Sequence, residues 1–171
     1  GDYPNIELHI YGRGPSVPIL KDLAVKLELG DRMKIFDSVP LDRIPALMAN
    51  ADIGIVPKRA DGFGDQAYST KIMEFMSQGL PVVLSRTRID SLYFNDSVAA
   101  FFESGNPDDL ARAVREVLSN PNYRRQLSEQ GYAYAKANSW ETMKDVYLDV
   151  VDRLTLTGVP VRPEQPGQNQ T

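Results

Sequence analysis

The chain has 171 residues, of which 42% are hydrophobic and 25% charged, and this is enough for one folded core. It has no cysteine and one histidine, which excludes disulfides and thiolate-bound metals and argues against any metal ion held by the protein. The net charge of −4 argues against nucleic-acid binding, and we find no signal peptide or transmembrane segment, so we expect a cytoplasmic protein whose full-length form can lie at a membrane surface.

Strand and helix patterns alternate through the first fifty residues. They predict a strand over Ile6–Tyr11, a helix over Pro18–Leu29, a strand over Met33–Phe36 and a helix over residues 41–50. The turn Gly12-Arg13-Gly14-Pro15 follows the first strand. It lacks the third glycine of a dinucleotide-binding fingerprint and is weak evidence for NAD.

The same alternation continues to residue 156. The patterns predict strands over residues 51–56, 81–84 and 98–102, and helices over residues 69–79, 87–95, 107–119, 121–136 and 139–156. Short connections between alternating strands and helices are typical of a mostly parallel sheet with right-handed crossovers. We therefore predict a Rossmann-like, three-layer α/β/α domain over residues 1–157, with a disordered Pro/Gln-rich tail over residues 158–171.

The stretch from Gln66 to Ser85 combines a loop, a helix start and a buried strand. Ser69 and Thr70 are good N-caps, and a loop that feeds a helix at the carboxyl ends of parallel strands is suited to binding an anion. Glu74 lies one turn into this helix, off its apolar stripe. Its carboxylate could accept hydrogen bonds from a ribose diol. Alternatively, Glu74 could be a solvated surface residue whose negative charge stabilises the helix through the helix dipole.

Basic residues near this stretch have two readings. Lys71, in the first helical turn, could reach a phosphate or could be solvated. Lys58 and Arg59 follow the strand 51–56 at the ligand edge of the predicted sheet, where they could contact a diphosphate or simply belong to a solvated loop. Asp61 and Asp65 have no third ligand nearby, so we predict no metal site.

Four short motifs carry a resemblance to a known family. They are Phe63-Gly64, Ser69-Thr70-Lys71, Glu74-Phe75-Met76 and the run from Gly79 to Val83. Together they resemble the signature of the retaining, nucleotide-sugar-dependent glycosyltransferases of family 4, which have the GT-B fold. That signature has two glutamates separated by seven residues. Here Glu74 matches the second, and Gln66 occupies the position of the first.

The resemblance implies a site and its ligands. The nucleotide base would lie at the turn containing Val39 and Pro40, the ribose diol on Glu74, and the diphosphate on the loop from Ala67 through Tyr68 to Ser69 and Thr70. Gln66 would occupy the catalytic position near the donor sugar. The nucleotide-diphosphate sugar would be a substrate, so no cofactor is implied. The acceptor would be a carbohydrate or a lipid-linked molecule.

Two departures from the family pattern affect the expected activity. Such enzymes have an earlier strand whose loop supplies an arginine and a lysine to the diphosphate, and an N-terminal acceptor-binding half; neither matches any part of these 171 residues. We therefore expect this polypeptide alone to bind donor weakly and transfer little sugar. Glutamine at position 66 lacks the charge that would stabilise an oxocarbenium-like transition state. The sequence leaves two alternatives open, a non-catalytic nucleotide- or partner-binding domain and a sugar-nucleotide epimerase of GT-B architecture.

Overall fold

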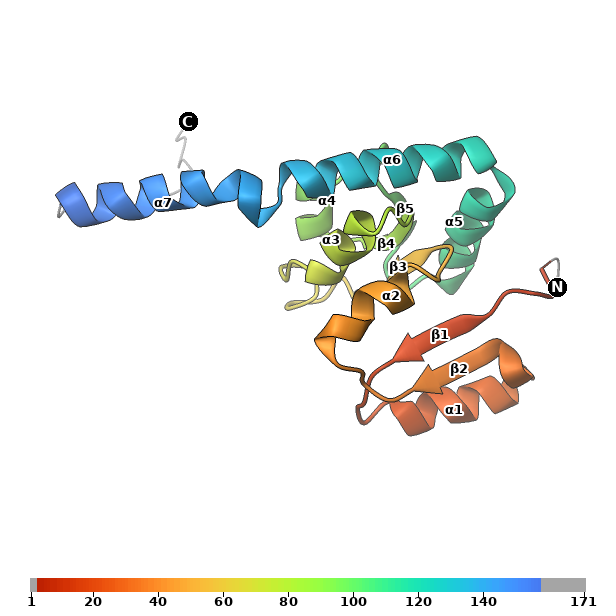
Figure 1. The fold of residues 1–171 in the computed structure, drawn as a ribbon. Coiled ribbons are helices and arrows are strands. Elements are labelled where there is room, and N and C mark those ends of the chain that lie inside the picture. Colours follow the sequence, from red (N-terminus) through yellow and green to blue (C-terminus); the bar gives the residue numbers. More distant parts are fainter. Residues whose placement is uncertain (1–2, 158–171) are drawn as a thin grey trace, which may run out of the picture. The chain divides into compact units, whose positions relative to one another are not determined.

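A computed structural model describes residues 3–157 of the chain (Figure 1). The chain divides into two compact units, residues 1–50 and residues 51–171. Each unit has its own parallel sheet, two-stranded in the first and three-stranded in the second. Parallel strands with flanking helices confirm the predicted α/β class.

The first unit contains two strands joined by a helical crossover. Its elements are β1 (Leu8–Tyr11), α1 (Val17–Lys26), the 3₁₀ turn η1 (Gly30–Arg32), β2 (Met33–Phe36), the 3₁₀ turn η2 (Leu41–Arg43) and α2 (Ile44–Met48). β1 and β2 are parallel, with Leu8 opposite Met33. The helix predicted over residues 41–50 is shorter than expected. It is α-helical only from Ile44, next to Pro45, whose missing N–H is tolerated in a first turn.

Burial in the first unit is low. None of its described residues is fully buried, and Ile19, Val25 and Leu41 are exposed at 67%, 79% and 84%. The apolar residues of α1 are only partly covered, since Leu20 and Ala24 are half-buried whereas Ile19 is exposed. Within this unit, α1 and two strands do not enclose a core.

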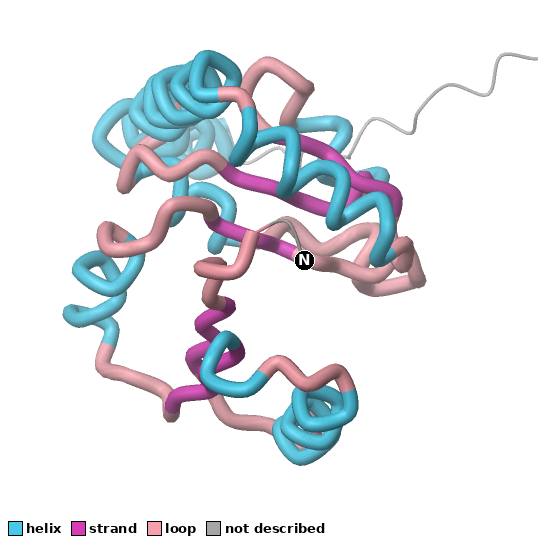
Figure 2. Tube along the Cα trace, turned by 90° about the vertical axis from the view of Figure 1, so that its right-hand side faces the viewer, coloured by secondary structure: helices cyan, strands magenta, loops and turns pink. Residues whose placement is uncertain are grey.

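The second unit contains a three-stranded parallel sheet in the order β3-β4-β5. Its elements are β3 (Gly54–Val56), α3 (Thr70–Ser77), β4 (Val82–Arg86), α4 (Arg88–Tyr93), β5 (Ala100–Glu103), α5 (Pro107–Ser119), α6 (Pro121–Ala137) and α7 (Trp140–Thr157). Figure 2 shows the strands of this sheet between helices. Every predicted element of this half is present, with ends displaced by up to three residues.

Side chains of β4 alternate between two cores, one on each face of the sheet. Val82 and Leu84 pack with Ile72 and Met76 of α3, and Val83 packs on the opposite face. The second face is covered by α5 and the first half of α6, through Ala113, Val117 and Leu127. β4 is therefore buried on both sides, as predicted for a central parallel strand.

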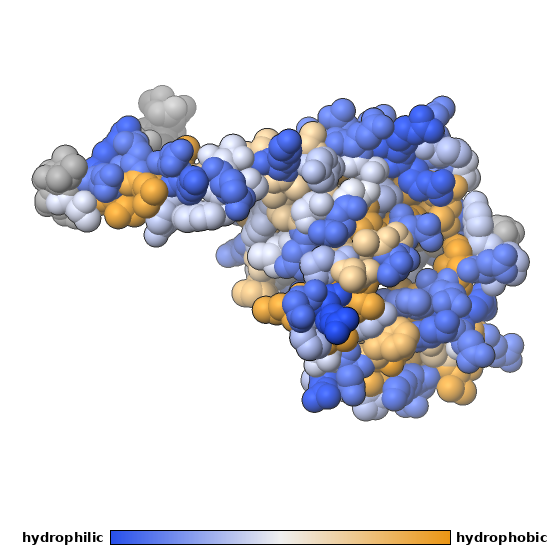
Figure 3. Space-filling model, viewed as in Figure 1, coloured by the Kyte–Doolittle hydropathy of each residue, from blue (hydrophilic) through white to orange (hydrophobic). Residues whose placement is uncertain are grey.

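Helix ends in the second unit follow recognisable chemical signals. Thr87, Asn106 and Asn120 accept hydrogen bonds from backbone N–H groups in the first turns of α4, α5 and α6. Gly79 follows α3 with φ +71°, a left-handed conformation that suits glycine. α7 continues beyond α6, and orange apolar side chains lie among its blue polar ones (Figures 1 and 3). Within residues 3–157, no helix is both long and apolar enough to cross a membrane.

Candidate functional site

Residues 57–69, termed here the site loop, leave the carboxyl end of β3 and lead to α3. The loop is tightly folded on itself. The Phe63 carbonyl accepts hydrogen bonds from the backbone N–H groups of Gln66 (3.1 Å) and Ala67 (2.8 Å), and the Asp61 carbonyl accepts one from Asp65 N–H (2.8 Å). A β-carbon on Gly64 would collide with the Arg59 carbonyl, so the close approach of these backbones requires glycine.

Asp65 attaches the site loop to the start of α4. Its side-chain Oδ1 accepts a hydrogen bond from the Arg88 N–H (2.7 Å), and its backbone carbonyl accepts one from the Ile89 N–H (3.1 Å). Both donors are first-turn N–H groups that a helix cannot satisfy internally. The residue immediately before Gln66 is thus fixed to α4, while the Gln66 side chain is exposed.

Lys58 holds the residue that follows Gln66. Its Nζ donates to the Ala67 carbonyl (2.7 Å) and lies 2.9 and 2.8 Å from the two carboxylate oxygens of Asp90. Asp90 is completely buried and also accepts a hydrogen bond from the Thr87 hydroxyl (2.6 Å). The ammonium of Lys58 was predicted to contact a diphosphate. In this structure it bonds to the Ala67 carbonyl and to the Asp90 carboxylate.

Two serines connect the carboxyl ends of the three strands. Ser85, in β4, accepts a hydrogen bond from the Lys58 N–H (2.7 Å). Ser104, just after β5, donates to the Lys58 carbonyl (2.8 Å) and accepts from the Ala60 N–H (2.7 Å). The start of the site loop is therefore bonded to β4 and to the residue that follows β5.

The N-terminus of α3 lacks a side-chain cap. Ser69 occupies the N-cap position, as predicted, but its side chain accepts no hydrogen bond from the helix. Thr70 and Lys71 in the first turn are exposed, and so is Glu74 in the next turn. The Ser69 carbonyl accepts a hydrogen bond from the Ile72 N–H (3.2 Å), and the N–H groups of Thr70 and Lys71 remain at the positive end of the helix dipole without a side-chain cap.

Tyr68 belongs to a group of aromatic side chains beside the site loop. Its ring contacts Tyr93 edge-on, with centroids 5.1 Å apart, and lies 5.9 Å from Phe94. Burial, followed by the fields of Tyr134, Tyr93 and Asp90, raises the pKa of Tyr68 to about 12. A tyrosine is protonated at neutral pH even at its ordinary pKa of 10.0, so this shift changes its protonation only above pH 10.

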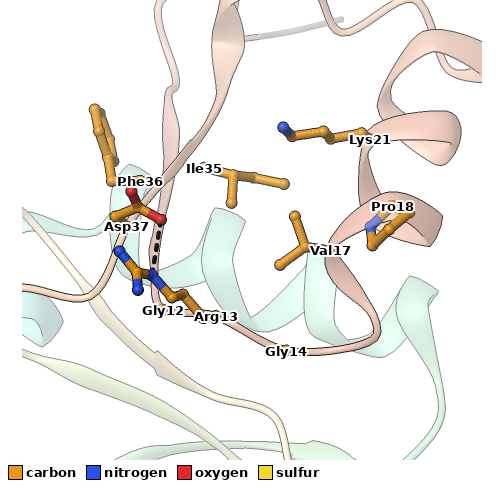
Figure 4. Close-up of a pocket in the computed structure, with 9 residues that line it drawn as sticks. All are labelled: Gly12, Arg13, Gly14, Val17, Pro18, Lys21, Ile35, Phe36 and Asp37. Atoms are coloured by element: carbon orange, nitrogen blue, oxygen red, sulfur yellow. Dashed lines mark hydrogen bonds and ion pairs between the residues drawn. The ribbon is translucent and has the colours of Figure 1, made fainter.

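The remaining predicted site residues, Val39 and Pro40, belong to the first unit. They follow β2, and Val39 is half-buried whereas Pro40 is exposed. At the same end of this unit, a hollow of about 650 Å³ is lined by residues of the Gly12–Gly14 turn, the start of α1 and the end of β2 (Figure 4). Arg13 and Asp37 form an ion pair across its rim at 3.1 Å. Lys21 points toward the hollow from α1.

The structure thus brings together Lys58 and the contiguous residues 66–71, with Glu74 on the following turn of α3. Four polar residues that sequence reasoning did not assign to the site also meet there: Ser85, Thr87, Asp90 and Ser104. One signal was present, since Thr87-x-x-Asp90 has the spacing of a helix-capping pair. Among the described residues, no cluster of His, Asp and Glu side chains could hold a metal ion.

Comparison with known proteins gives the class of this fold. The structure superposes on sucrose-phosphate synthase from Thermosynechococcus elongatus with a TM-score of 0.77 at 18% identity, over 88% of this chain and 39% of that one. Anabaena HepE in complex with UDP-glucose gives a TM-score of 0.72 at 19% identity, over 91% and 42% of the two chains. The fold is that of a Rossmann-like α/β domain of GT-B glycosyltransferases.

Sequence comparison gives the family. The family model described as glycosyl transferases group 1 matches residues 2–134. The chain is 27% identical to D-inositol 3-phosphate glycosyltransferase of Thermobifida fusca over 149 residues, which are 84% of this chain and 33% of that protein. The chain belongs to the group 1 glycosyl transferases. It spans no more than 40% of the length of the curated relatives it matches.

Proposed function

We propose that this chain is the donor-binding domain of a retaining glycosyltransferase, which moves a sugar from a nucleotide-diphosphate sugar to a carbohydrate or lipid-linked acceptor. The observation that carries the proposal is the uncapped N-terminus of α3 at the end of the anchored site loop. The N–H groups of Thr70 and Lys71, which have no hydrogen-bond partner among the described residues, and the helix dipole favour an anion such as a diphosphate. Thr70 supplies a hydroxyl and Lys71 a cation at the same helix end.

Glu74 and Gln66 complete the proposed donor site. Glu74 is exposed one turn beyond the helix start, where its carboxylate can accept two hydrogen bonds from a ribose diol. Gln66 lies between the two anchored residues Asp65 and Ala67, next to the expected position of the sugar. The solved complex of HepE with UDP-glucose supports this class of donor.

Glutamine at position 66, where the family signature has glutamate, favours one alternative, a donor-binding domain without transferase activity. An amide oxygen still accepts a hydrogen bond, but it cannot stabilise developing positive charge as a carboxylate does. A donor-binding protein without transferase activity would keep Glu74 and tolerate Gln66. The third possibility, a sugar-nucleotide epimerase, would use the same diphosphate and ribose contacts.

Product analysis distinguishes these functions. The full-length protein would be incubated with UDP-glucose or GDP-mannose, with and without a panel of carbohydrate and lipid-linked acceptors, and the products followed by proton NMR. A retaining transferase gives a glycoside whose anomeric configuration matches that of the donor. Inversion at the anomeric carbon would contradict the retaining mechanism.

The acceptor-free reactions test the alternatives. An epimerase changes the donor sugar without any acceptor, whereas a transferase needs one. Calorimetric titration with both donors provides the matching binding measurement. Saturable binding of a donor with no product under any condition would support a non-catalytic binding domain, and absence of binding to either donor would contradict donor recognition by this chain.

A further inference from the structure

We propose that Lys58, Asp90 and Thr87 form a buried clamp whose function is to position Gln66 against the donor sugar. This inference rests on the proposed function, because it assigns a positioning role within the same donor site. None of the three is assigned a ligand contact. They act through the backbone carbonyl of Ala67, to which the Lys58 ammonium is bonded at 2.7 Å.

The polar groups of the clamp are bonded to one another and to the Ala67 carbonyl. Lys58 directs its ammonium at the Ala67 carbonyl and at both oxygens of Asp90, and its side chain is only 13% exposed. Asp90 is fully buried and is held from its own helix by the Thr87 hydroxyl at 2.6 Å. Three protein oxygens within 2.9 Å of this ammonium compete with any phosphate for its N–H donors. Lys58 therefore belongs to the support of the site loop rather than to its ligand contacts.

Gln66 lies between two attachments to the same short helix. On one side, Asp65 binds the Arg88 and Ile89 N–H groups at the start of α4. On the other, Lys58 links the Ala67 carbonyl to Asp90, which is also in α4. α4 directly follows β4, whose residues Val82 to Ser85 are buried. The backbone at Gln66 is thereby attached to the helix that follows the buried central strand of the second unit.

A purely structural role explains this arrangement less well. Replacing a buried ion pair by apolar side chains of similar volume is often neutral or stabilising, so stability alone does not call for Lys58 and Asp90. An apolar pair could fill the space, but it could not hold the Ala67 carbonyl in one direction. Precise placement of a group beside the reacting sugar affects the rate far more than it affects affinity for the rest of the donor.

The test compares the double variant Lys58→Met/Asp90→Asn, which removes both charges together, with wild type in the full-length protein. Val117→Ala is the matched control, because Val117 is fully buried in the core on the α5 side of the sheet and its truncation lowers stability without touching the site loop. Three quantities are measured: affinity for UDP and GDP, kcat and KM with UDP-glucose and GDP-mannose, and hydrogen–deuterium exchange of residues 63–70.

The clamp predicts that kcat and hydrogen exchange change in the double variant while affinity for the nucleoside diphosphate does not. In the double variant, kcat falls by about tenfold to a hundredfold. Affinity for the nucleoside diphosphate stays within about threefold of wild type, because the first turn of α3 and Glu74 are unchanged. Exchange of residues 63–70 becomes faster. In Val117→Ala, kcat and the exchange of residues 63–70 remain as in wild type.

Two results would overturn the clamp. Unchanged exchange of residues 63–70 in the double variant would show that Lys58 and Asp90 do not hold the site loop. Diphosphate affinity reduced by about tenfold or more with kcat retained would show that Lys58 is a direct phosphate ligand. A wild-type protein that binds and consumes neither donor would instead remove the proposed function, while the exchange measurement would still decide whether the clamp exists.

Discussion

Phe75 of α3 lies directly against the backbone of Gly54 in β3. A β-carbon on Gly54 would stand 2.5 Å from Cγ of the Phe75 ring, so Gly54→Ala cannot be accommodated without displacing the ring or the helix. We expect this variant to lose about 1–3 kcal/mol of unfolding free energy through overpacking. A double-mutant cycle measures the effect: the unfolding free energies of Gly54→Ala, Phe75→Ala and the double variant are determined by chemical denaturation and compared with that of wild type.

The expected coupling between the two substitutions has a definite sign. Gly54→Ala should cost much less when Phe75 is already alanine, because the colliding ring is gone. Gly62→Ala is the control, since a β-carbon on Gly62 meets nothing within 4 Å. Equal losses from Gly54→Ala in both backgrounds would contradict this packing.

Tyr68 provides a prediction at high pH. Its folded-state pKa is raised from 10.0 to about 12, first by burial and then by Tyr134, Tyr93 and Asp90. Above pH 10 the unfolded chain releases this proton while the folded chain keeps it, so stability falls as pH rises from 10 to 12. Urea denaturation across this range should give a shallower decline for Tyr68→Phe than for wild type. Identical declines would mean that Tyr68 titrates normally.

Much of the fold follows from local sequence signals. The predicted bounds of β2 and α5 agree with the structure residue for residue. An Asn-Pro pair marks each end of α5, Asn106-Pro107 at its start and Asn120-Pro121 after its last residue. Alternation of strand and helix patterns was sufficient to predict parallel pairing. The helix over residues 41–50 was predicted too long, because its apolar periodicity does not distinguish a 3₁₀ turn from an α-helix.

The candidate site is only partly visible in the sequence. Gln66, Ser69, Thr70 and Glu74 are near one another in the chain, so their proximity could be inferred. Asp90 comes from a different crossover, and its pairing with Lys58 depends on how α4 leaves β4. Ser69 has the right type for an N-cap, but whether its hydroxyl turns toward the helix depends on the path of the site loop. These features are set by tertiary contacts, which a single sequence does not specify.

Glu74→Ala tests the ribose contact. If Glu74 accepts hydrogen bonds from the ribose diol, its removal should weaken nucleoside diphosphate binding by about 1.5–3 kcal/mol, or roughly tenfold to a hundredfold. Isothermal titration with UDP and GDP measures this loss. Glu129→Ala, which removes an exposed glutamate from α6, is the matched control and should bind like wild type. Equal affinities for wild type and Glu74→Ala would remove the ribose assignment.

Gln66→Glu tests whether the amide limits catalysis. A carboxylate at this position should raise kcat more than donor affinity, because it interacts mainly with positive charge that develops in the transition state. Binding of the sugar-free diphosphate should hardly change. Initial rates of the full-length protein are compared with those of Gln126→Glu, which adds the same charge to the exposed surface of α6. An unchanged or lower kcat would show that glutamine suits the proposed transfer.

The central position of β4 also has a consequence for how the second unit folds. Both β3 and β5 pair only with β4 in this sheet, and each pairing needs a crossover rather than a hairpin. Such non-local pairing is slow, since chain entropy is lost before the contacts form. We expect the folding nucleus to include β4 and the helix side chains packed on it. Conservative substitutions at Val83 or Leu84 should therefore slow folding, whereas substitutions along the exposed α7 should mainly accelerate unfolding.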